Sequence, residues 1–427
     1  MDTIFALASA PGRAGVSIVR VSGPRAFEAA RALCGSVPAF RVAGLRKLVD
    51  EHGALLDEAL VLAFEPGKSF TGEEVVEFQV HGSLAVVSAL LDFLSRMEGL
   101  RIAEAGEFTR RALENGKMDL TQVEALSDLI DAETEAQRKQ ASDVLSGAIG
   151  KLVEQWRRDL IRAAALLEAT IDFADEDVPV DVTDEVRALA NSVRLDLEQQ
   201  LSGLKAAERV RTGFEVAIVG SPNVGKSTLL NYLAGRDAAI TSEIAGTTRD
   251  VIEVRMDVGG YAVTLIDTAG LRETGDAVEA IGVDRALKRA AEADIRIHLL
   301  EQDEKPTLDV RQHDFVLKGK ADVQDRDGDI SGITGEGVSE FLNALETTLS
   351  QMSSRAGVAS RVRHKVALQD GLTHLESALV LLAEGPELYD VASEEIRVSA
   401  RSMESLLGYV DVEHLLDEIF SSFCVGK

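Results

Sequence analysis

The stretch from Gly220 to Ser227 reads Gly-Ser-Pro-Asn-Val-Gly-Lys-Ser, which is the G-x-x-x-x-G-K-S pattern of a phosphate-binding loop. An apolar run at residues 214–219 precedes it, and a helical pattern closed by a glycine at 228–235 follows it. The motif requires this order of strand, glycine-rich loop and helix N-terminus. Backbone N–H groups in such a loop surround phosphate oxygens. The sequence therefore predicts an α/β nucleotide-binding domain.

Two side chains of this loop have predicted roles in binding a nucleotide. Lys226 is expected to reach the β- and γ-phosphates, and the Ser227 hydroxyl is expected to bind Mg²⁺. The predicted nucleotide contacts of the loop and helix start are Asn223, Val224, Gly225, Lys226, Ser227 and Thr228.

Length and composition limit what surrounds this domain. A chain of 427 residues exceeds one ordinary core, so two to four domains are expected. The only cysteines, Cys34 and Cys424, lie far apart, which indicates a reducing compartment without a disulfide framework. The sequence shows neither a signal peptide nor an apolar run of about 18 residues, so we expect a cytoplasmic protein that does not enter a membrane.

The formal net charge of −27 argues against non-specific nucleic-acid binding, which needs a basic surface. Any contact with RNA is therefore expected to be local, or shared with a partner that supplies positive charge.

Periodicity divides the chain into regions. Residues 1 to about 117 read as mixed α/β, with strands expected near 16–21, 60–64 and 75–80 and a helix near 84–94. Helical spacing dominates from about 118 to 210 and again after about 355, while strands and helices alternate from about 214 to 350. We therefore expect an α/β domain inserted into a helical bundle built from both flanking parts.

Two further motifs indicate nucleotide hydrolysis. Asp267-Thr-Ala-Gly270 follows an apolar strand, so Asp267 is expected to hold a metal-bound water and Gly270 to offer its N–H to the γ-phosphate. Thr248, in Gly246-Thr-Thr-Arg-Asp250, is the candidate switch threonine that binds Mg²⁺ in the triphosphate state. Three motifs in this order predict a nucleotide hydrolase.

The base is expected to be guanine. Gly319-Lys-Ala-Asp322 stands where an Asn-Lys-x-Asp motif is expected, so Asp322 can accept hydrogen bonds from guanine and Lys320 can pack over the base. A backbone N–H of Ser331-Gly-Ile333 can meet the guanine carbonyl. Gly319 lacks the Asn amide, and losing one neutral hydrogen bond costs about 0.5–1.5 kcal/mol. We therefore predict somewhat weak binding of GTP.

The position after Gly270 leaves the orientation of the attacking water open. Ras-like enzymes use a Gln there, whereas this chain has Leu271. The water could instead be oriented by one of three nearby acids, Glu273, Asp276 and Glu279. The transition-state cation could be an arginine (Arg249, Arg255 or Arg272) or an ion from solution.

A set of motifs spread over the whole chain resembles one family. They include Asp2-Thr-Ile4, Pro11-Gly-Arg-Ala-Gly15, Phe70-Thr-Gly-Glu73, Ala105-Gly-Glu-Phe-Thr109, Asn115-Gly-Lys-Met-Asp-Leu120, Pro222-Asn-Val-Gly-Lys-Ser227, Ala245-Gly-Thr-Thr-Arg-Asp250 and Phe423-Cys-Val-Gly-Lys427. On these residues the chain resembles the MnmE (TrmE) family of tRNA modification GTPases.

The resemblance implies a multidomain fold, α/β plus all-α. An α+β domain at 1–117 would bind formyl-tetrahydrofolate and dimerise. A helical bundle at 118–210 and 353–427 would carry an inserted Ras-like P-loop G domain at 211–352. The family acts as a homodimer with an FAD-dependent partner subunit of the MnmG (GidA) type, together a heterotetramer, and modifies C5 of the wobble uridine in certain tRNAs. The product carries an aminomethyl or carboxymethylaminomethyl group.

The resemblance also implies a potassium-dependent hydrolase. By motif match, the K⁺ ligands are Asn223, Ser242, Ile244 and Thr247, the Mg²⁺ ligands are Ser227 and Thr248, and the catalytic residue is Glu279. The family's nucleotide contacts extend to Ser242, Glu243, Ile244, Ala245, Gly246, Thr247, Thr248, Asp267, Thr268, Ala269, Gly270, Lys320 and Asp322.

For 5-formyl-tetrahydrofolate, or a related one-carbon folate, the match implies a site at Arg20, Glu77, Lys117 and Lys427. From their strand pattern alone, Arg20 and Glu77 could equally be solvent-facing residues. Cys424 matches the family's C-terminal cysteine, which either acts as a nucleophile on the uridine or packs.

Two other readings share the G-domain motifs. A ribosome-assembly GTPase of the Era or Der type would need an RNA-binding appendage, usually basic, which this acidic chain does not show. A purely regulatory switch would bind partners without modifying anything. Folate binding would separate the first reading from both.

Overall fold

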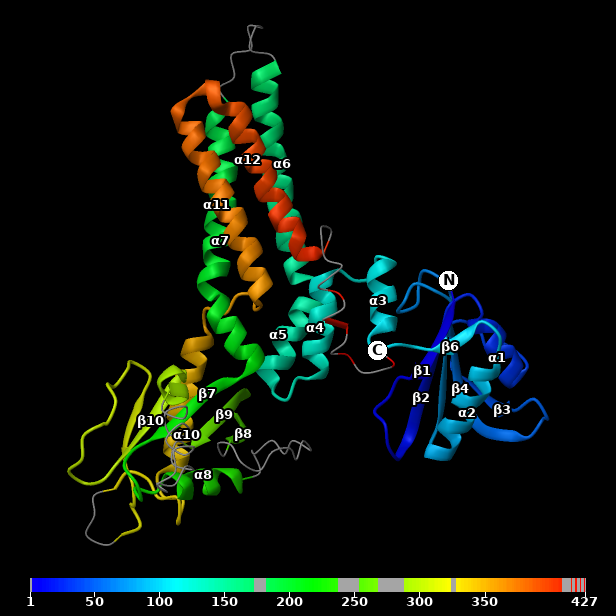
Figure 1. Cartoon of the computed structure of the whole chain (residues 1–427), viewed down its shortest axis with the longest axis horizontal. Coiled ribbons are helices and arrows are strands. Elements are labelled where there is room, and N and C mark those ends of the chain that lie inside the picture. The colour runs from blue at the N-terminus through cyan, green and yellow to red at the C-terminus, as the bar shows by residue number, and fades with distance from the viewer. Residues whose placement is uncertain are drawn as a thin grey trace, which may run out of the picture. The chain divides into compact units, whose positions relative to one another are not determined.

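The structure is a computed structural model that describes residues 2–172, 182–236, 253–267, 288–323 and 328–408, with 416, 419–420, 423 and 426 near the C-terminus. The chain divides into two compact units (Figure 1). The first comprises Met1–Ser127 with Glu404–Lys427, and the second is Asp128–Met403.

The first unit is built on a six-stranded sheet in the order β3-β4-β5-β2-β1-β6. Its strands are β1 (Thr3–Leu7), β2 (Ala14–Ser22), β3 (Gly44–Val49), β4 (Leu55–Phe64), β5 (Val75–Gly82) and β6 (Leu100–Ile102). Helices α1 (Ala26–Cys34) and α2 (Leu84–Arg96) pack on one face, over alternate apolar residues such as Val19, Val61 and Phe78. The strands predicted near 16–21, 60–64 and 75–80, and the helix near 84–94, are confirmed.

The opposite face of this sheet is covered over β1 by α3 (Glu107–Glu114), whose Phe108 packs against Ile4 and Ala6. Further along, Leu45 lies opposite Leu60 in the register of β3 and β4. These two side chains remain 59% and 42% exposed. In the described part of the unit this face therefore keeps an apolar strip open to solvent.

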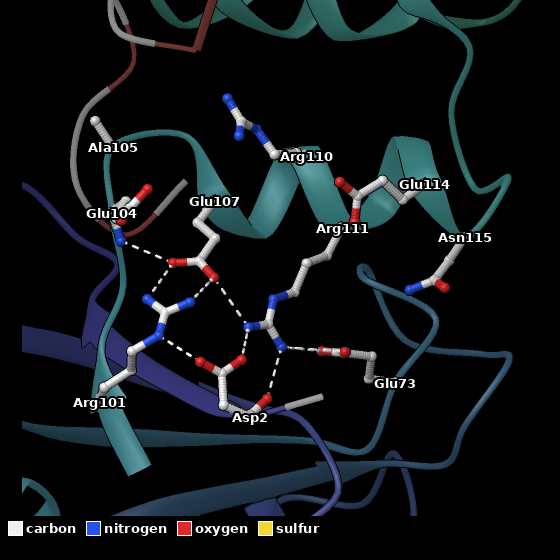
Figure 2. Close-up of a pocket in the computed structure, with 10 residues that line it drawn as sticks. All are labelled: Asp2, Glu73, Arg101, Glu104, Ala105, Glu107, Arg110, Arg111, Glu114 and Asn115. Carbon is white, nitrogen blue, oxygen red and sulfur yellow. Dashed lines mark hydrogen bonds and ion pairs between the residues drawn. The ribbon is translucent and has the colours of Figure 1, made fainter. Parts of the chain in front are cut away.

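An ion-pair network fastens α3 to the strands (Figure 2). Arg111 contacts Asp2 at 2.8 Å, Glu73 at 3.1 Å and Glu107 at 2.9 Å. Arg101 contacts Asp2 and Glu107, each at 2.5 Å. These groups line a pocket of about 310 Å³. Buried charges need partners. The charged side chains that line this pocket pair with one another, and these pairs fix its shape.

The second unit contains the long helices of the bundle: α6 (Ala148–Asp172), α7 (Thr183–Thr212), α11 (Val362–Glu384) and α12 (Tyr389–Glu404). Helix α7 packs against both α6 and α11, and its Thr183 hydroxyl lies 2.8 Å from that of Tyr389. Helical segments from both sides of the α/β region thus join in one bundle, as their periodicity predicts. The shorter elements of this unit are α5 (Glu135–Leu145) and η1 (Pro386–Leu388). The 3-10 helix η2 (Ser405–Leu407) belongs to the first unit, and α4 (Leu120–Ile130) begins in the first unit and ends in the second.

Between α7 and α11 the chain forms a five-stranded sheet in the order β11-β10-β7-β9-β8. Its elements are β7 (Phe214–Val219), α8 (Lys226–Ala234), β8 (Glu253–Val258), β9 (Tyr261–Asp267), β10 (Ile295–Leu300), β11 (Phe315–Lys318) and α10 (Val338–Ser353). All neighbouring strands are parallel except β8, which pairs antiparallel with β9 at the edge. The carboxyl ends of the parallel strands therefore meet at one edge, where α/β sheets bind ligands.

Among the described helices, none is both long and apolar enough to cross a membrane.

We predict that Arg111→Leu destabilises the full chain by about 3–5 kcal/mol at pH 7, because it removes the arginine that pairs with the largely buried carboxylates of Glu73 and Glu107. The measurement is the urea dependence of unfolding. Arg96→Leu is the control, because it removes an exposed pair with Glu51, and exposed pairs contribute about 0–1 kcal/mol.

The difference between wild type and Arg111→Leu should shrink in acid. Burial by itself raises the pKa of Glu107, but hydrogen bonds from Arg101 and Arg111 outweigh it and leave the pKa below its usual value. A carboxyl with a lowered folded-state pKa contributes stability above its unfolded pKa and loses it as pH falls through the folded pKa. A difference that stays constant from pH 7 to pH 3 would contradict the assigned pairing.

Candidate nucleotide-binding site

The phosphate loop occupies the turn between β7 and α8. Asn223 has a positive φ of 61° and Gly225 one of 112°, so the loop curls back before α8 begins at Lys226. The Lys226 ammonium is buried and donates to the carbonyls of Gly220 and Ser221, both at 2.7 Å. Burial lowers the pKa of Lys226, while the charges of Asp267 and Glu304 act in the opposite direction. The loop thus holds a cation at the place where phosphates are expected.

Ser227 and Asp267 lie together although 40 positions separate them. The Ser227 hydroxyl donates to the Asp267 carboxylate at 2.6 Å, and Asp267 is only 1% exposed. They meet because β9, which ends at Asp267, is the parallel neighbour of β7. A hydroxyl beside a carboxylate is a ligand set that suits Mg²⁺.

A pocket of about 270 Å³ adjoins the loop. It is lined by Asn223, Val224, Gly225, Thr228, Leu229, Leu299, Gly319, Lys320, Asp322, Val323, Ile330, Gly332 and Ile333. The buried Ser331 hydroxyl donates to the Asp322 carboxylate at 2.5 Å and accepts from the N–H groups of Ile333 and Thr334. Asp322 is therefore oriented within a pocket that can hold a base.

Residues 319–322, which follow β11 and are called the base loop below, lie against the phosphate loop. Gly319 is the residue at this contact. A Cβ at this position would be 2.8 Å from the Val224 carbonyl oxygen, closer than real side chains approach. The Gly319 N–H donates to Leu300, and Gly319 bridges to Ile330. An asparagine here would require one loop to shift, so the departure from Asn-Lys-x-Asp is built into the packing.

Two acids at this site were missed by the sequence analysis, Glu301 and Glu304. The Lys320 ammonium, predicted to pack over the base, pairs with Glu301 at 2.6 Å. The Glu304 carboxylate accepts from the Ser221 hydroxyl at 2.9 Å. The available signal was that both acids follow directly on the carboxyl end of β10, at the ligand-binding edge.

Arg255, one candidate for the transition-state arginine, lies on β8 and pairs with Glu133 at 2.8 Å. The Arg255 side chain therefore points toward the residues just before α5.

In the first unit, Arg20 and Glu77 lie directly opposite each other on β2 and β5. Arg20 Nε donates to Glu77 at 2.9 Å, and the guanidinium lies 5.3 Å from the centre of the Phe70 ring. Lys117 donates to the carbonyl of Gly67 at 2.7 Å. The short loop that contains Gly67 and Phe70 thus contacts both predicted cations of the folate site.

The other predicted site residues lie outside the described part of the chain: Ser242, Glu243, Ile244, Ala245, Gly246, Thr247, Thr248, Thr268, Ala269, Gly270, Glu279, Cys424 and Lys427.

Two family models match the chain. The model described as GTP-binding protein TrmE N-terminus matches residues 3–117, and the MnmE helical domain matches residues 120–424. Proteins called tRNA modification GTPase MnmE from Roseobacter denitrificans and Ruegeria pomeroyi are each 58% identical, and the alignments cover 100% of both chains. Among solved structures, that of Era in complex with MgGDPNP and a segment of 16S ribosomal RNA is 25% identical over 32% of this chain and 56% of that one, with a TM-score of 0.24. On its full-length relatives and the two family models, the chain belongs to the MnmE family of tRNA modification GTPases.

Proposed function

We propose that this GTPase depends on potassium and works with an FAD-dependent partner subunit to modify C5 of a tRNA wobble uridine, with a formyl-tetrahydrofolate as one-carbon donor. The GTP-hydrolysis part of this proposal is supported by the hydrogen bond between Ser227, at the end of the phosphate loop, and Asp267, beside the pocket that contains Asp322. The folate half is supported by Arg20, Glu77 and Lys117 around one loop.

In the hydrolytic step, the chain's own groups bind and orient the nucleotide. Lys226 would exchange its two carbonyl partners for phosphate oxygens and oppose the charge that develops on them. Ser227 and Thr248 would bind Mg²⁺, and Asp267 would hold a water on the ion, which neutralises phosphate charge when bound. Asn223 would offer its amide oxygen to K⁺, and Glu279 would orient water, because Leu271 cannot.

The folate site is proposed from charge. Arg20 and Lys117 can pair with the carboxylates of a folate, and Glu77 can accept from pterin N–H groups. The aromatic rings of Phe70 and Phe108, which lie 5.3 and 5.6 Å from the Arg20 guanidinium, give the site an apolar wall.

The homodimer is proposed from the open sheet face of the same unit. The apolar strip at Leu45 and Leu60 is the kind of exposed patch that marks an interface. A two-fold interface would pair this strip with its own copy. Because the chain carries a net charge of −27, the partner subunit would supply most of the positive charge that faces tRNA.

We expect GTP turnover to be at least about tenfold faster in potassium chloride than in sodium chloride at equal ionic strength, as an electrostatic catalyst of this kind would give. Asn223→Ala should abolish the difference, and Glu279→Gln should slow turnover in both salts. Asn231→Ala, an exposed change on α8, is the control and should keep the potassium effect. Equal wild-type rates in the two salts would refute the ion site.

Ser331→Ala should weaken GDP binding about 2- to 12-fold, because the hydrogen bond that orients Asp322 is worth about 0.5–1.5 kcal/mol. Asp322→Asn replaces an acceptor with a donor, so it should weaken GDP and strengthen xanthosine diphosphate, which carries a carbonyl at C2. Titration calorimetry with both nucleotides is the measurement. Retained preference for GDP in Asp322→Asn would show that the pocket does not read the base through this carboxylate.

Alanine variants of Arg20, Glu77 and Lys117 should each bind 5-formyl-tetrahydrofolate at least about tenfold more weakly, the usual scale for a charge-assisted hydrogen bond. Fluorescence or calorimetric titration measures this, with Lys47→Ala, an exposed lysine on β3, as the control. Wild-type affinity in all three variants would remove the proposed site. A wild-type chain that does not bind the folate at all would favour a GTPase that acts as a switch.

A further inference from the structure

A short acidic turn after β10, residues 301–304, contacts both nucleotide-binding motifs at once. Glu304 accepts from the Ser221 hydroxyl of the phosphate loop at 2.9 Å, and Glu301 pairs with Lys320 of the base loop at 2.6 Å. The turn is closed on itself, because the Glu304 N–H donates to the Glu301 carbonyl and the Glu301 N–H donates to the Glu304 carboxylate, both at 3.2 Å. Two carboxylates are thus held in place against groups that a nucleotide would use.

Glu304 also lies within the electrostatic reach of Lys226. The Lys226 ammonium bonds to the carbonyl of Ser221, the same residue whose hydroxyl bonds to Glu304. The Glu304 carboxylate and the Lys226 ammonium attract each other across this shared residue. A bound nucleotide brings several negative charges to the same ammonium, so carboxylate and phosphates repel each other at short range.

The neighbouring acid Asp303 shows that position in the turn matters. Asp303 is exposed, whereas Glu301 and Glu304 are partly buried and directed at the site by the contacts above. The charge of a solvated acid such as Asp303 is screened by water and salt. Glu301 and Glu304 therefore face residues of the nucleotide site, whereas Asp303 of the same turn faces solvent.

We propose that the acidic turn is an internal anionic ligand of the nucleotide site, with which GTP and GDP compete. Glu304 stabilises the nucleotide-free phosphate loop through Ser221 and opposes the incoming phosphates. Glu301 holds Lys320 away from the base until the nucleotide displaces it. The turn lowers affinity for both nucleotides, and it does so in addition to the missing amide at Gly319.

The test is the binding of a fluorescent GDP to full-length Glu304→Gln at low and high salt. The carboxamide oxygen keeps an acceptor for Ser221 and removes the charge, so binding should tighten about three- to tenfold at low salt, the scale of one like-charge contact at a protein surface. The gain should shrink at high salt because screening weakens the repulsion that was removed. Asp303→Asn removes the same charge from the same turn and should change affinity less than about twofold.

Unchanged or weaker binding in Glu304→Gln would overturn the proposal, and so would an equal gain in Asp303→Asn, which would indicate net charge alone. Competition by inorganic pyrophosphate, which has phosphates but no base, shows whether each acid acts on the phosphates or on the base. Glu304→Gln should tighten pyrophosphate as well as GDP, whereas Glu301→Gln should tighten GDP only. A Glu304→Gln gain that is absent with pyrophosphate would overturn its action on the phosphates. Failure of the wild-type chain to bind either nucleotide would instead contradict the GTPase assignment.

Discussion

The nucleotide site depends on one backbone contact between neighbouring strands. A Cβ at Gly220, the residue that follows β7, would lie 2.1 Å from the carbonyl oxygen of Leu299 on β10. Only a glycine permits this approach, and its φ of 155° turns the chain into the phosphate loop. The contact brings the loop against the carboxyl edge of the sheet. Asp267 from β9 and the base loop after β11 reach the same edge because β11, β10, β7 and β9 lie side by side in this order and run parallel.

Charge is arranged differently in the two units. In the first unit, acids and arginines around α3 neutralise one another, so the pocket in Figure 2 is a structural joint. Arg20 and Glu77 also pair, but beside an aromatic wall and an open sheet face, where a ligand with both charges and rings could replace their mutual contact. In the second unit, acids stand next to the cations of a site for a polyanion. Complementary pairs stabilise a unit, whereas like charges at a ligand site adjust how tightly the ligand binds.

Local patterns were sufficient to predict part of the elements, whereas β1, β3, β6, α1 and α3 were not predicted. Alternating apolar residues predicted β2, β4 and β5, helical spacing predicted the bundle, and the glycine-rich motif predicted the β7–loop–α8 unit. The same patterns could not assign Arg20 and Glu77, since alternation places both on one face but does not say what they meet there. The structure pairs them across 57 positions. Nor did any local signal mark Arg111, because its three partners come from the N-terminus, the loop before β5 and its own helix.

The sequence by itself determined the class of chemistry. A GTPase is indicated by the phosphate loop at 220–227 together with Asp267 and Asp322, because phosphate and base recognition require these residue types in this order. Only the tertiary structure decided how strongly the site holds its ligand. The approach of Gly319 to Val224, the orientation of Asp322 by Ser331 and the contact of Glu304 with Ser221 join residues that are 9 to 95 positions apart. Motifs are read along the chain, whereas affinity depends on distances between segments, and those distances are set when the strands pack side by side.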